Sequence, residues 1–427
     1  MKTKNAFFAA VFAAAALTGM LTAMLFAPGR ADAAENEKRG VSYSFESASD
    51  SEMALFAPSL KWFYNWGNGL SKTVDSAAKA HGLSYFPMAW NDVEEDILRY
   101  YKKNHPDCEY LLAYNEPNLT DQANMTPTQA AKKWKRLLKI AKELKLKIVA
   151  PAMNYGTLKD YGDPIKWLDE FFAKPGVSLK DVSAIAIHCY MKNPAAVKSY
   201  IDKFKKYGKP IWMTEFCAWD GGVASVDEQM AYMSETVVYM ELDPAVERYA
   251  WFIPKGDEDE TVVPYNKLIT QSKPPALTPL GKVYAAMTRC DKTVYAAPGQ
   301  TIEAEHFSDC NLSQSVNAEG FSRPVHFRPS TDADGGLDIF DFSDGKWVDY
   351  QIETAVDKPY TLSLRASAAQ PTTLIISVDG GPAQSLALPQ SAAWTTHTAP
   401  LPLAPGKHSL RLQVTSGNCA VNWIKVE

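Results

Sequence analysis

Between about Gly40 and Met287, short runs of β-branched and aromatic residues alternate with longer amphipathic segments, eight times over. The clearest amphipathic segment is Thr128–Leu144, whose apolar residues recur at helical spacing. Eight such repeats in about 250 residues favour a closed (β/α)8 (TIM) barrel over an open sheet. The expected strands are Gly40–Phe45, Lys61–Trp66, Ser84–Trp90, Glu109–Tyr114, Lys147–Met153, Ala184–Tyr190, Pro210–Phe216 and Glu247–Pro254, and further expected helices are Val93–Lys103, Ala195–Tyr207 and Val226–Met240.

The pattern changes near residue 296. Beyond it, helical periodicity gives way to short alternating runs such as Tyr360–Arg365, Thr373–Val378 and Ser409–Val414. Asp-Gly, Gly-Gly and Pro-Gly turns separate these runs, which is typical of an antiparallel β-sandwich. We therefore expect a barrel over residues 35–296 and an all-β, jelly-roll-like sandwich over residues 297–427.

The N-terminus has the form of a secretory signal. Lys2 and Lys4 precede an apolar run from Ala6 to about Pro28, and small residues follow at Ala31-Asp32-Ala33. We predict a cleaved signal peptide over residues 1–34 and a secreted, extracellular protein. The apolar run is long, so an uncleaved anchor is the alternative.

Charge and cysteine content narrow the classes of partner. The chain has 427 residues and a net charge of −5, which gives no electrostatic case for a nucleic acid or, after signal cleavage, a membrane. Six cysteines and an export signal permit disulfides; Cys310–Cys419 is the suggested pair, and free buried thiols are the alternative. No CxxC or HExxH spacing occurs, so we expect no cofactor or metal in catalysis. We expect a monomer.

Two carboxylates stand where the expected barrel would place an active site, at the C-terminal ends of its strands. Glu116 follows the fourth strand in AYNEPN, and Glu215 ends the seventh strand in TEF. A lone glutamate after a strand is usually a solvated loop residue or a helix cap. Two of them at strand ends that converge only in a closed barrel are much more specific.

Cleaving a glycosidic bond with retention requires such a pair, because one group protonates the leaving oxygen while the other attacks the anomeric carbon. We predict Glu116 as the general acid/base and Glu215 as the nucleophile. Asn115 is a candidate for bonding the sugar 2-hydroxyl. Tyr190 and His188 could donate to Glu215 and keep it charged, although a histidine at such a position is as often structural.

Aromatic residues make up 11% of the chain, and several stand at strand ends where rings could stack on sugars. The candidate substrate-binding rings of the barrel are Trp66, Trp90, Trp219 and Trp251. The alternation of Trp62, Tyr64 and Trp66 along one strand also fits a face of packed core rings.

The segments KWFYNWG, FPMAW, YNEPN, APAMN, AIHCY, PIWMTEF and ERYAWF resemble glycoside hydrolase family 128 of clan A, in order, over about Gly40–Met287. The resemblance implies an O-glycosyl hydrolase, usually an endo-acting β-1,3-glucanase. It also implies that the strand-four and strand-seven glutamates, here Glu116 and Glu215, act as acid/base and nucleophile.

The C-terminal segments TIEAEHF, DGKWVDYQI and VNWIKVE resemble carbohydrate-binding module family 6. The resemblance implies a sugar-binding sandwich with a structural Ca²⁺, for which Glu303 and Glu305 match the ligating pair. Asn422 stands where the family usually has aspartate, which should weaken Ca²⁺ binding. Ala420 replaces an asparagine of the loop-end sugar site, so Trp394 is the ring we expect to bind sugar, with a packed core ring as the alternative.

The leading hypothesis is a secreted, retaining endo-β-1,3-glucanase that forms a covalent glycosyl-enzyme and carries a sugar-binding sandwich. One alternative is another clan A β-glycanase, acting on β-1,4 or mixed-linkage polymers. The other is a non-catalytic carbohydrate-binding protein.

Overall fold

The computed structural model of the protein describes residues 37–46, 48–57, 59–220, 222–256, 265–313 and 324–427. The predicted signal peptide therefore lies outside the described residues. Within the described part, no helix is both long and apolar enough to span a membrane.

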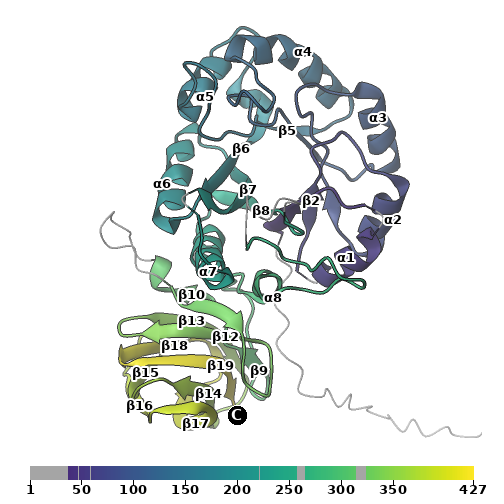
Figure 1. Cartoon of the computed structure of the whole chain (residues 1–427). Helices are drawn as coiled ribbons and strands as arrows, with labels where there is room; N and C mark the ends of the chain where they lie inside the picture. The colour runs from purple at the N-terminus through teal and green to yellow at the C-terminus, as the bar shows by residue number, and fades with distance from the viewer. Residues whose placement is uncertain (1–36, 47, 58, 221, 257–264, 314–323) are drawn as a thin grey trace, which may run out of the picture.

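Eight parallel strands form the N-terminal half in the order β3-β2-β1-β8-β7-β6-β5-β4. The sheet closes on itself through a parallel bridge between Met88 and Leu112. Figure 1 looks along this barrel, with the helices arranged around it. Its strands are β1 Arg39–Ser42, β2 Trp62–Tyr64, β3 Ser84–Tyr85, β4 Tyr110–Leu112, β5 Lys147–Val149, β6 Val182–Met191, β7 Ile211–Asp220 and β8 Val246–Phe252. The predicted (β/α)8 architecture is confirmed.

Polar caps start most of the surrounding helices. In α4 the Thr126 hydroxyl accepts from the Gln129 backbone while the Gln129 side chain reaches back, a capping box. Asp163 and Asn193 cap α5 and α6, and each is followed by a proline, whose fixed φ suits the first helical position. The helices are α1 Ser49–Phe56, α2 Lys72–Ala80, α3 Glu95–Asn104, α4 Pro127–Glu143, α5 Pro164–Phe172, α6 Pro194–Phe204, α7 Val226–Leu242 and α8 Pro279–Ala286, with short 3-10 turns at Leu179–Asp181, Lys205–Tyr207 and Asn311–Ser313.

The inside of the barrel is filled by side chains of unequal size. Bulky rings from Trp62, Phe86 and Trp212 pack together, with Trp62 and Trp212 centroids 5.6 Å apart. The neighbouring strands contribute small residues such as Ala186 and Ala250. The interpretation of the second strand as packed core rings thus holds for Trp62 and Tyr64, which are both fully buried and stack with centroids 6.3 Å apart. Trp66 lies beyond the strand and lines the active-site end.

The C-terminal half is a sandwich of two antiparallel sheets. One has the order β10-β13-β18-β15-β16, and the other β11-β12-β19-β14-β17 with β9 paired to β19. The strands are β9 Thr301–Glu303, β10 Asp309–Cys310, β11 His326–Pro329, β12 Leu337–Ser343, β13 Trp347–Thr354, β14 Lys358–Ala368, β15 Thr372–Val378, β16 Gln384–Leu388, β17 Ser391–Leu403, β18 Gly406–Ser416 and β19 Asn418–Val426.

The predicted Cys310–Cys419 disulfide is wrong. Cys310 lies on β10 in the first sheet and Cys419 on β19 in the second, where its thiol faces the Phe342 carbonyl. All six cysteines are buried, and none forms a disulfide.

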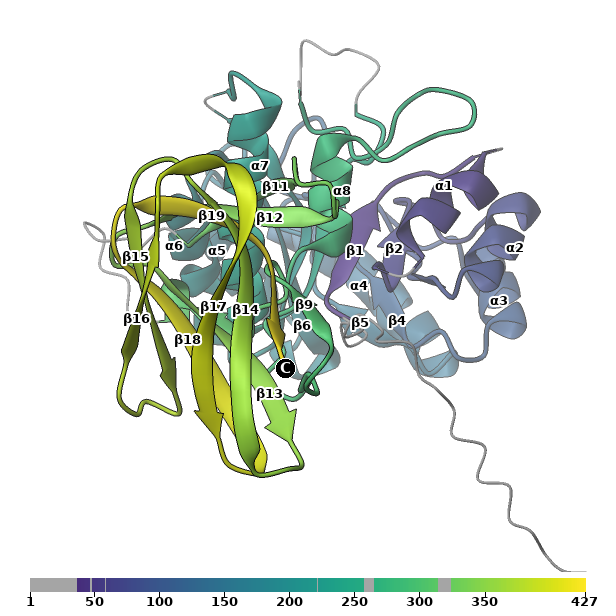
Figure 2. The same ribbon diagram turned by 90° about the horizontal axis from the view of Figure 1, so that it is seen from below.

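The sandwich packs directly against α7 and α8 of the barrel (Figure 2). The Phe327 backbone of β11 donates to the Ser234 hydroxyl of α7 (3.1 Å), and His326 Nε2 lies 2.9 Å from Glu235 Oε1. Because the sandwich covers the side of α7 that would otherwise face water, Ser234, Glu235 and Val238 are all buried. The two halves therefore share a packed interface.

Candidate active site

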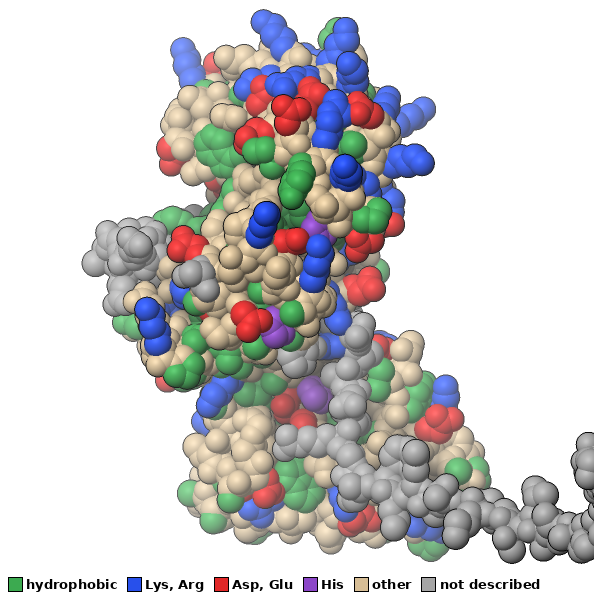
Figure 3. Space-filling model, turned by 90° about the vertical axis from the view of Figure 1, so that its right-hand side faces the viewer, with side chains coloured by type: hydrophobic (Ala, Val, Ile, Leu, Met, Phe, Trp, Pro, Cys, Tyr) green, Lys and Arg blue, Asp and Glu red, His purple; other side chains and the backbone are tan. Residues whose placement is uncertain are grey.

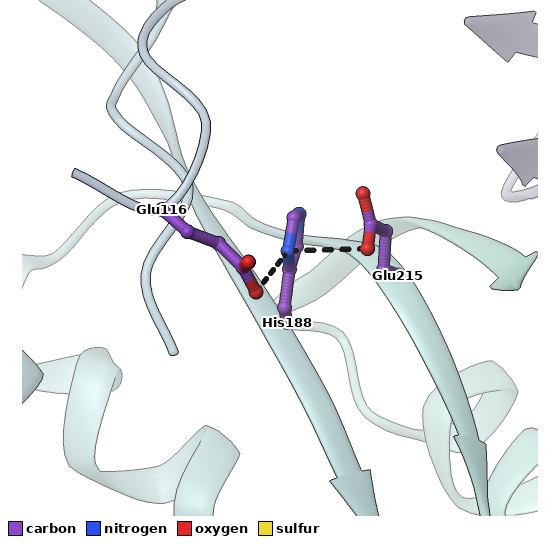
Figure 4. Close-up of side chains that lie close together, drawn as sticks. All are labelled: Glu116, His188 and Glu215. Atoms are coloured by element: carbon purple, nitrogen blue, oxygen red, sulfur yellow. Dashed lines mark hydrogen bonds and ion pairs between the residues drawn. The ribbon is translucent and has the colours of Figure 1, made fainter. Parts of the chain in front are cut away.

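Glu116 and Glu215 converge as the sequence predicted (Figure 4), Glu116 from the segment just after β4 and Glu215 from the middle of β7, which continues to Asp220 instead of ending at Phe216. They are 5% and 3% exposed, and an oxygen of each lies within 4.8 Å of the other. Glu116 has a φ of 43°, in the left-handed region that is costly for a residue with a side chain. Such strain is concentrated at functional sites, and here it turns the Glu116 side chain toward the cleft.

Glu215 is surrounded by hydrogen-bond donors. The Tyr64 hydroxyl (2.6 Å) and the Trp66 indole nitrogen (2.8 Å) both donate to Oε1, and the Tyr190 hydroxyl donates to Oε2. Burial raises the pKa of Glu215, while the charge of His188 and the bonds from Tyr190 and Tyr64 act in the opposite direction. The donors thus support the ionised carboxylate against its burial.

His188 bridges the two carboxylates instead of facing the cleft. Its Nδ1 lies 2.9 Å from Glu116 Oε1 and 3.4 Å from Glu215 Oε2, and the side chain is fully buried. Burial lowers the pKa of His188, but the charges of Glu215 and Glu116 together raise it above the ordinary value. His188 thus lies where the sequence expected a donor to Glu215, and Glu116 is a second, closer partner. Because the side chain is fully buried and outside the cleft lining, His188 is not a substrate-binding residue. Among the described residues, Glu116, His188 and Glu215 form the one cluster of three side chains of the types that bind metal ions.

Asn154 was not selected from the sequence. Asn154 lies in the loop after β5, and its Nδ2 donates to Glu116 Oε1 across 3.0 Å. Tyr64 was also missed as a ligand of Glu215, because a ring in an alternating strand reads as core. Their position could have indicated a role in the active site, because both residues lie at or beyond the C-terminal end of a barrel strand.

A cleft of about 530 Å³ opens over the two carboxylates. Its lining includes the predicted Trp66, Trp90, Asn115, Tyr190 and Trp219, together with Leu119, Asp121, Gln122, Asn154, Tyr155 and Phe252. Asn115 donates through Nδ2 to Gln122 Oε1 (3.1 Å). Its buried Oδ1 has no hydrogen-bond partner among the described residues, which leaves an acceptor beside Glu116.

Aromatic rings form one end of this cleft. Trp219 and Phe252 stack at 6.3 Å with an interplanar angle of 7°, and Tyr190 meets both edge-on. Trp251 does not belong to this group. It is a fully buried residue of β8 whose ring packs on Phe216 and on Tyr232 of α7, and its indole donates to the Asn266 carbonyl (2.8 Å). These contacts remove it from the predicted sugar-binding set.

The predicted sites of the sandwich lie on its second sheet. Trp394 is half-buried on β17, and its indole donates to the Thr331 hydroxyl at 3.1 Å, so it is not a packed core ring. Glu303, Glu305 and Asn422 are buried. A Cβ on Gly336 would lie 3.2 Å from Glu303 Oε2 and 3.9 Å from Asn422 Oδ1, so both oxygens border this glycine.

Comparison with known proteins assigns each half. A family model described as the glycosyl hydrolase catalytic core matches residues 40–284, and one described as carbohydrate binding module (family 6) matches residues 317–427. A GH128 (subgroup II) endo-β-1,3-glucanase from Pseudomonas viridiflava is 35% identical, with a TM-score of 0.53 over 59% of this chain and 98% of that structure. The corresponding enzyme from Sorangium cellulosum is 28% identical, with a TM-score of 0.50 over 58% and 97%.

A curated relative is more distant. Alkali-sensitive linkage protein 1 of Schizosaccharomyces pombe is 27% identical over 237 residues, which cover 53% of this chain and 40% of that protein. The match thus spans less than half of the relative's length.

Proposed function

The chain belongs to the glycosyl hydrolase catalytic core family, and from this we propose that it is a secreted, monomeric, retaining endo-β-1,3-glucanase. That it is a glycosidase with a polysaccharide substrate follows from the family and from the appended carbohydrate-binding module. The proposal adds the linkage, the stereochemistry, the position of cleavage and the export.

The distance between the two carboxylates carries the proposal. Oxygens of Glu116 and Glu215 lie within 4.8 Å. Retaining glycosidases hold their carboxyl groups about 5–5.5 Å apart, whereas inverting enzymes leave roughly 6.5–9.5 Å for a water molecule. The pair leaves no such room for water, which favours direct attack by Glu215 on the sugar.

In the first step, Glu116 in its acid form would protonate the glycosidic oxygen while Glu215 attacks the anomeric carbon. The unequal donor sets support this division of roles. Tyr64, Trp66 and Tyr190 all donate to Glu215, so a single negative charge shared by the pair is better solvated there than on Glu116. Asn115 Oδ1 could accept a bond from the sugar 2-hydroxyl, a contact that strengthens in the transition state.

In the second step, Glu116, now a carboxylate, would take a proton from water as the water attacks the glycosyl ester on Glu215. The negative charge has then moved from Glu215 to Glu116. His188 Nδ1 is within reach of an oxygen of each residue, so one donor serves the charged carboxylate in both steps.

The linkage and the mode of cleavage rest on similarity. The two related structures described above are both named as endo-β-1,3-glucanases. The chain covers 98% and 97% of those structures, so their whole barrel has a counterpart here. The rings of Trp66, Trp90 and Trp219 offer apolar faces along the cleft on which glucose units can stack.

For the sandwich, we propose sugar binding at Trp394 and a structural Ca²⁺ held by Glu303, Glu305 and Asn422. The donor set fits this cation, which takes several oxygen ligands. The buried Asn422 Oδ1 has no hydrogen-bond partner among the described residues, as expected of an atom that serves an ion. Asn422 Nδ2 donates to Asp332 Oδ2 at 3.0 Å, which fixes the orientation of the amide.

The decisive experiment is mass-resolved product release from a linear β-1,3-glucan, with cellulose and mixed-linkage glucan alongside. A ladder of oligosaccharides from the β-1,3 polymer alone, initially in the β-anomeric form by NMR, is the expected result. Glucose as the sole early product would overturn endo action, and initial α-anomers would overturn retention. Products from cellulose or mixed-linkage glucan, with none from the β-1,3 polymer, would overturn the linkage while keeping Glu116 and Glu215.

A further inference from the structure

Helix α4 carries an unusual charge distribution on its outer surface. Lys132, Lys135, Lys139 and Lys142 are exposed and follow one another at intervals of three or four residues along one side of the helix. These four residues are called the lysine stripe below. It runs about 15 Å along the helix at 1.5 Å per residue. Figure 3 shows many lysine and arginine side chains over the upper part of the barrel, where α3 and α4 lie in Figure 1, with aspartate and glutamate side chains among them.

The lysine stripe is not neutralised by carboxylates. None of its four lysines has an ion pair among the described residues, and Glu143 is the only acidic residue of α4. Other barrel helices pair their cations internally, through Lys79–Asp75 in α2, Arg99–Glu95 in α3 and Lys198–Asp202 in α6. Like charges three or four residues apart destabilise a helix, so the stripe opposes the stability of α4. The whole-chain net charge of −5 conceals this local excess.

We propose that the lysine stripe binds an extended acidic polysaccharide with a carboxylate on each sugar. A chain lying along α4 could meet all four ammonium groups, and release of its condensed counterions would drive binding. The stripe would thus hold the enzyme on an acidic polymer while the cleft works on a neutral one. It lies on the side of the barrel away from the sandwich (Figure 1), so both could be occupied together.

The surroundings of the stripe disfavour other anions. Binding of single-stranded nucleic acid uses aromatic platforms for base stacking, and insertion into a membrane surface needs apolar side chains beside the cations. The exposed large hydrophobic residues among those described are Ile97, Tyr100, Tyr155, Tyr265 and Val356. None belongs to α4, and Ile97 and Tyr100 lie on the neighbouring helix α3. Along α4 itself the stripe offers charge alone, which suits a flexible, hydrated polyanion.

The test is retention of the full-length protein on immobilised polygalacturonate at low ionic strength, followed by elution with rising NaCl. In one variant all four stripe lysines are changed to glutamine. A matched control changes Lys72, Lys180, Lys209 and Lys282 to glutamine, lysines spread over the surface without ion pairs among the described residues. The stripe variant should bind at least about tenfold more weakly, with a salt-dependence slope smaller by about three to four, whereas the control should bind like the parent.

Hydrolysis of a soluble neutral glucan should be unchanged in both variants, which separates this proposal from that of the catalytic site. The stripe variant should melt no lower than the parent, because the repulsion between its like charges is removed. Equal weakening in the two variants, or no retention of the parent protein, would overturn the proposal. Tighter binding of the parent to single-stranded DNA or to polyphosphate than to polygalacturonate would overturn the choice of an acidic polysaccharide.

Discussion

The indole nitrogen of Trp66 donates to Oε1 of Glu215 across 2.8 Å and so ties the segment just after β2 to the middle of β7. Trp66 has a φ of 61°, a strained conformation for a residue with a side chain. The residue that the sequence suggested as a sugar platform therefore has a second task, because it also orients the proposed nucleophile.

Trp66→Phe should lower kcat while changing KM little. Phenylalanine keeps an aromatic face for the sugar but removes the donor to Glu215. A hydrogen bond to a charged group contributes about 1.5–3 kcal/mol, so the expected loss in kcat is about 10- to 100-fold. Steady-state kinetics on β-1,3-gluco-oligosaccharides measure it. Trp90→Phe is the control, since the Trp90 indole has no hydrogen bond among the described residues; equal losses in kcat would refute the orienting role.

Tyr190→Phe should move the acidic limb of the kcat/KM profile to higher pH. The Tyr190 hydroxyl lowers the pKa of Glu215, which burial has already raised, so removing the hydroxyl raises that pKa further. The nucleophile must be ionised, and activity is therefore lost at a higher pH. In Tyr155→Phe the lost hydroxyl was bonded to Lys203, not to a carboxylate, and the limb should stay in place. A limb that is unmoved in Tyr190→Phe contradicts the assignment.

Glu116→Ala should separate substrates by their leaving groups. Proton transfer to the glycosidic oxygen contributes about 10²–10⁴-fold, so hydrolysis of β-1,3-glucan should fall by that factor. An aryl β-glucoside oligomer with an acidic phenol needs little protonation and should still form the glycosyl-enzyme. Glu215→Ala serves as the comparison and should be inactive on both substrates. If Glu116→Ala lost both activities equally, the acid/base role would be wrong.

Glu215→Gln should stabilise the protein at neutral pH. The pKa of Glu215 is raised in the folded state, so its contribution to stability is complete below the unfolded-state pKa and declines as pH rises through the folded-state pKa. An uncharged glutamine avoids this loss, and Tm should therefore rise at pH 7. Near pH 4 the gain should largely disappear. Calorimetry at the two pH values tests this, with the exposed Glu143→Gln as control; a lower Tm at pH 7 would contradict it.

Asn422→Asp should make the sandwich dependent on Ca²⁺. Asn422 Nδ2 now donates to Asp332 Oδ2, so an aspartate there would set two carboxylates against each other and lower Tm in the presence of a chelator. Added Ca²⁺ should restore Tm and raise it above that of the parent. Asn418→Asp is the matched control, because Asn418 Nδ2 lies 3.4 Å from Asp341 Oδ1, away from Glu303 and Glu305. Rescue of both variants by Ca²⁺, or of neither, would rule out the proposed site.

Sequence patterns were sufficient for the architecture because the alternation of strands and helices is local. Family models and related structures confirm the resemblance of the two halves to glycosyl hydrolases and to carbohydrate-binding module family 6. The positions of Glu116 and Glu215 followed from the barrel alone, since a closed barrel brings the C-terminal ends of all its strands to one face.

The errors arose where the three-dimensional arrangement of the strands decides which way a side chain faces and which residues meet. Successive side chains of a strand point to opposite faces, and Ala250 points into the barrel, so its neighbour Trp251 must point outward to the helices. The residues WF at a strand end do not reveal which of the two faces inward. Cys310 and Cys419 are near the two ends of the sandwich sequence but lie in different sheets. His188 could be assigned to the active site, but its place between the carboxylates depends on the relative twist of β4, β6 and β7.

Helix α7 has consequences for how such proteins can be assembled from parts in evolution or by engineering. Its outer surface is buried under β11 and carries polar anchors, such as Ser234 bonded to the Phe327 backbone. A gene fusion that exchanged the sandwich for an unrelated module would leave this apolar helix exposed to solvent. Recombination at the junction should therefore succeed only when the codons for α7 are exchanged together with the module. The segment that must be inherited as one piece thus includes the sandwich and a helix of the barrel.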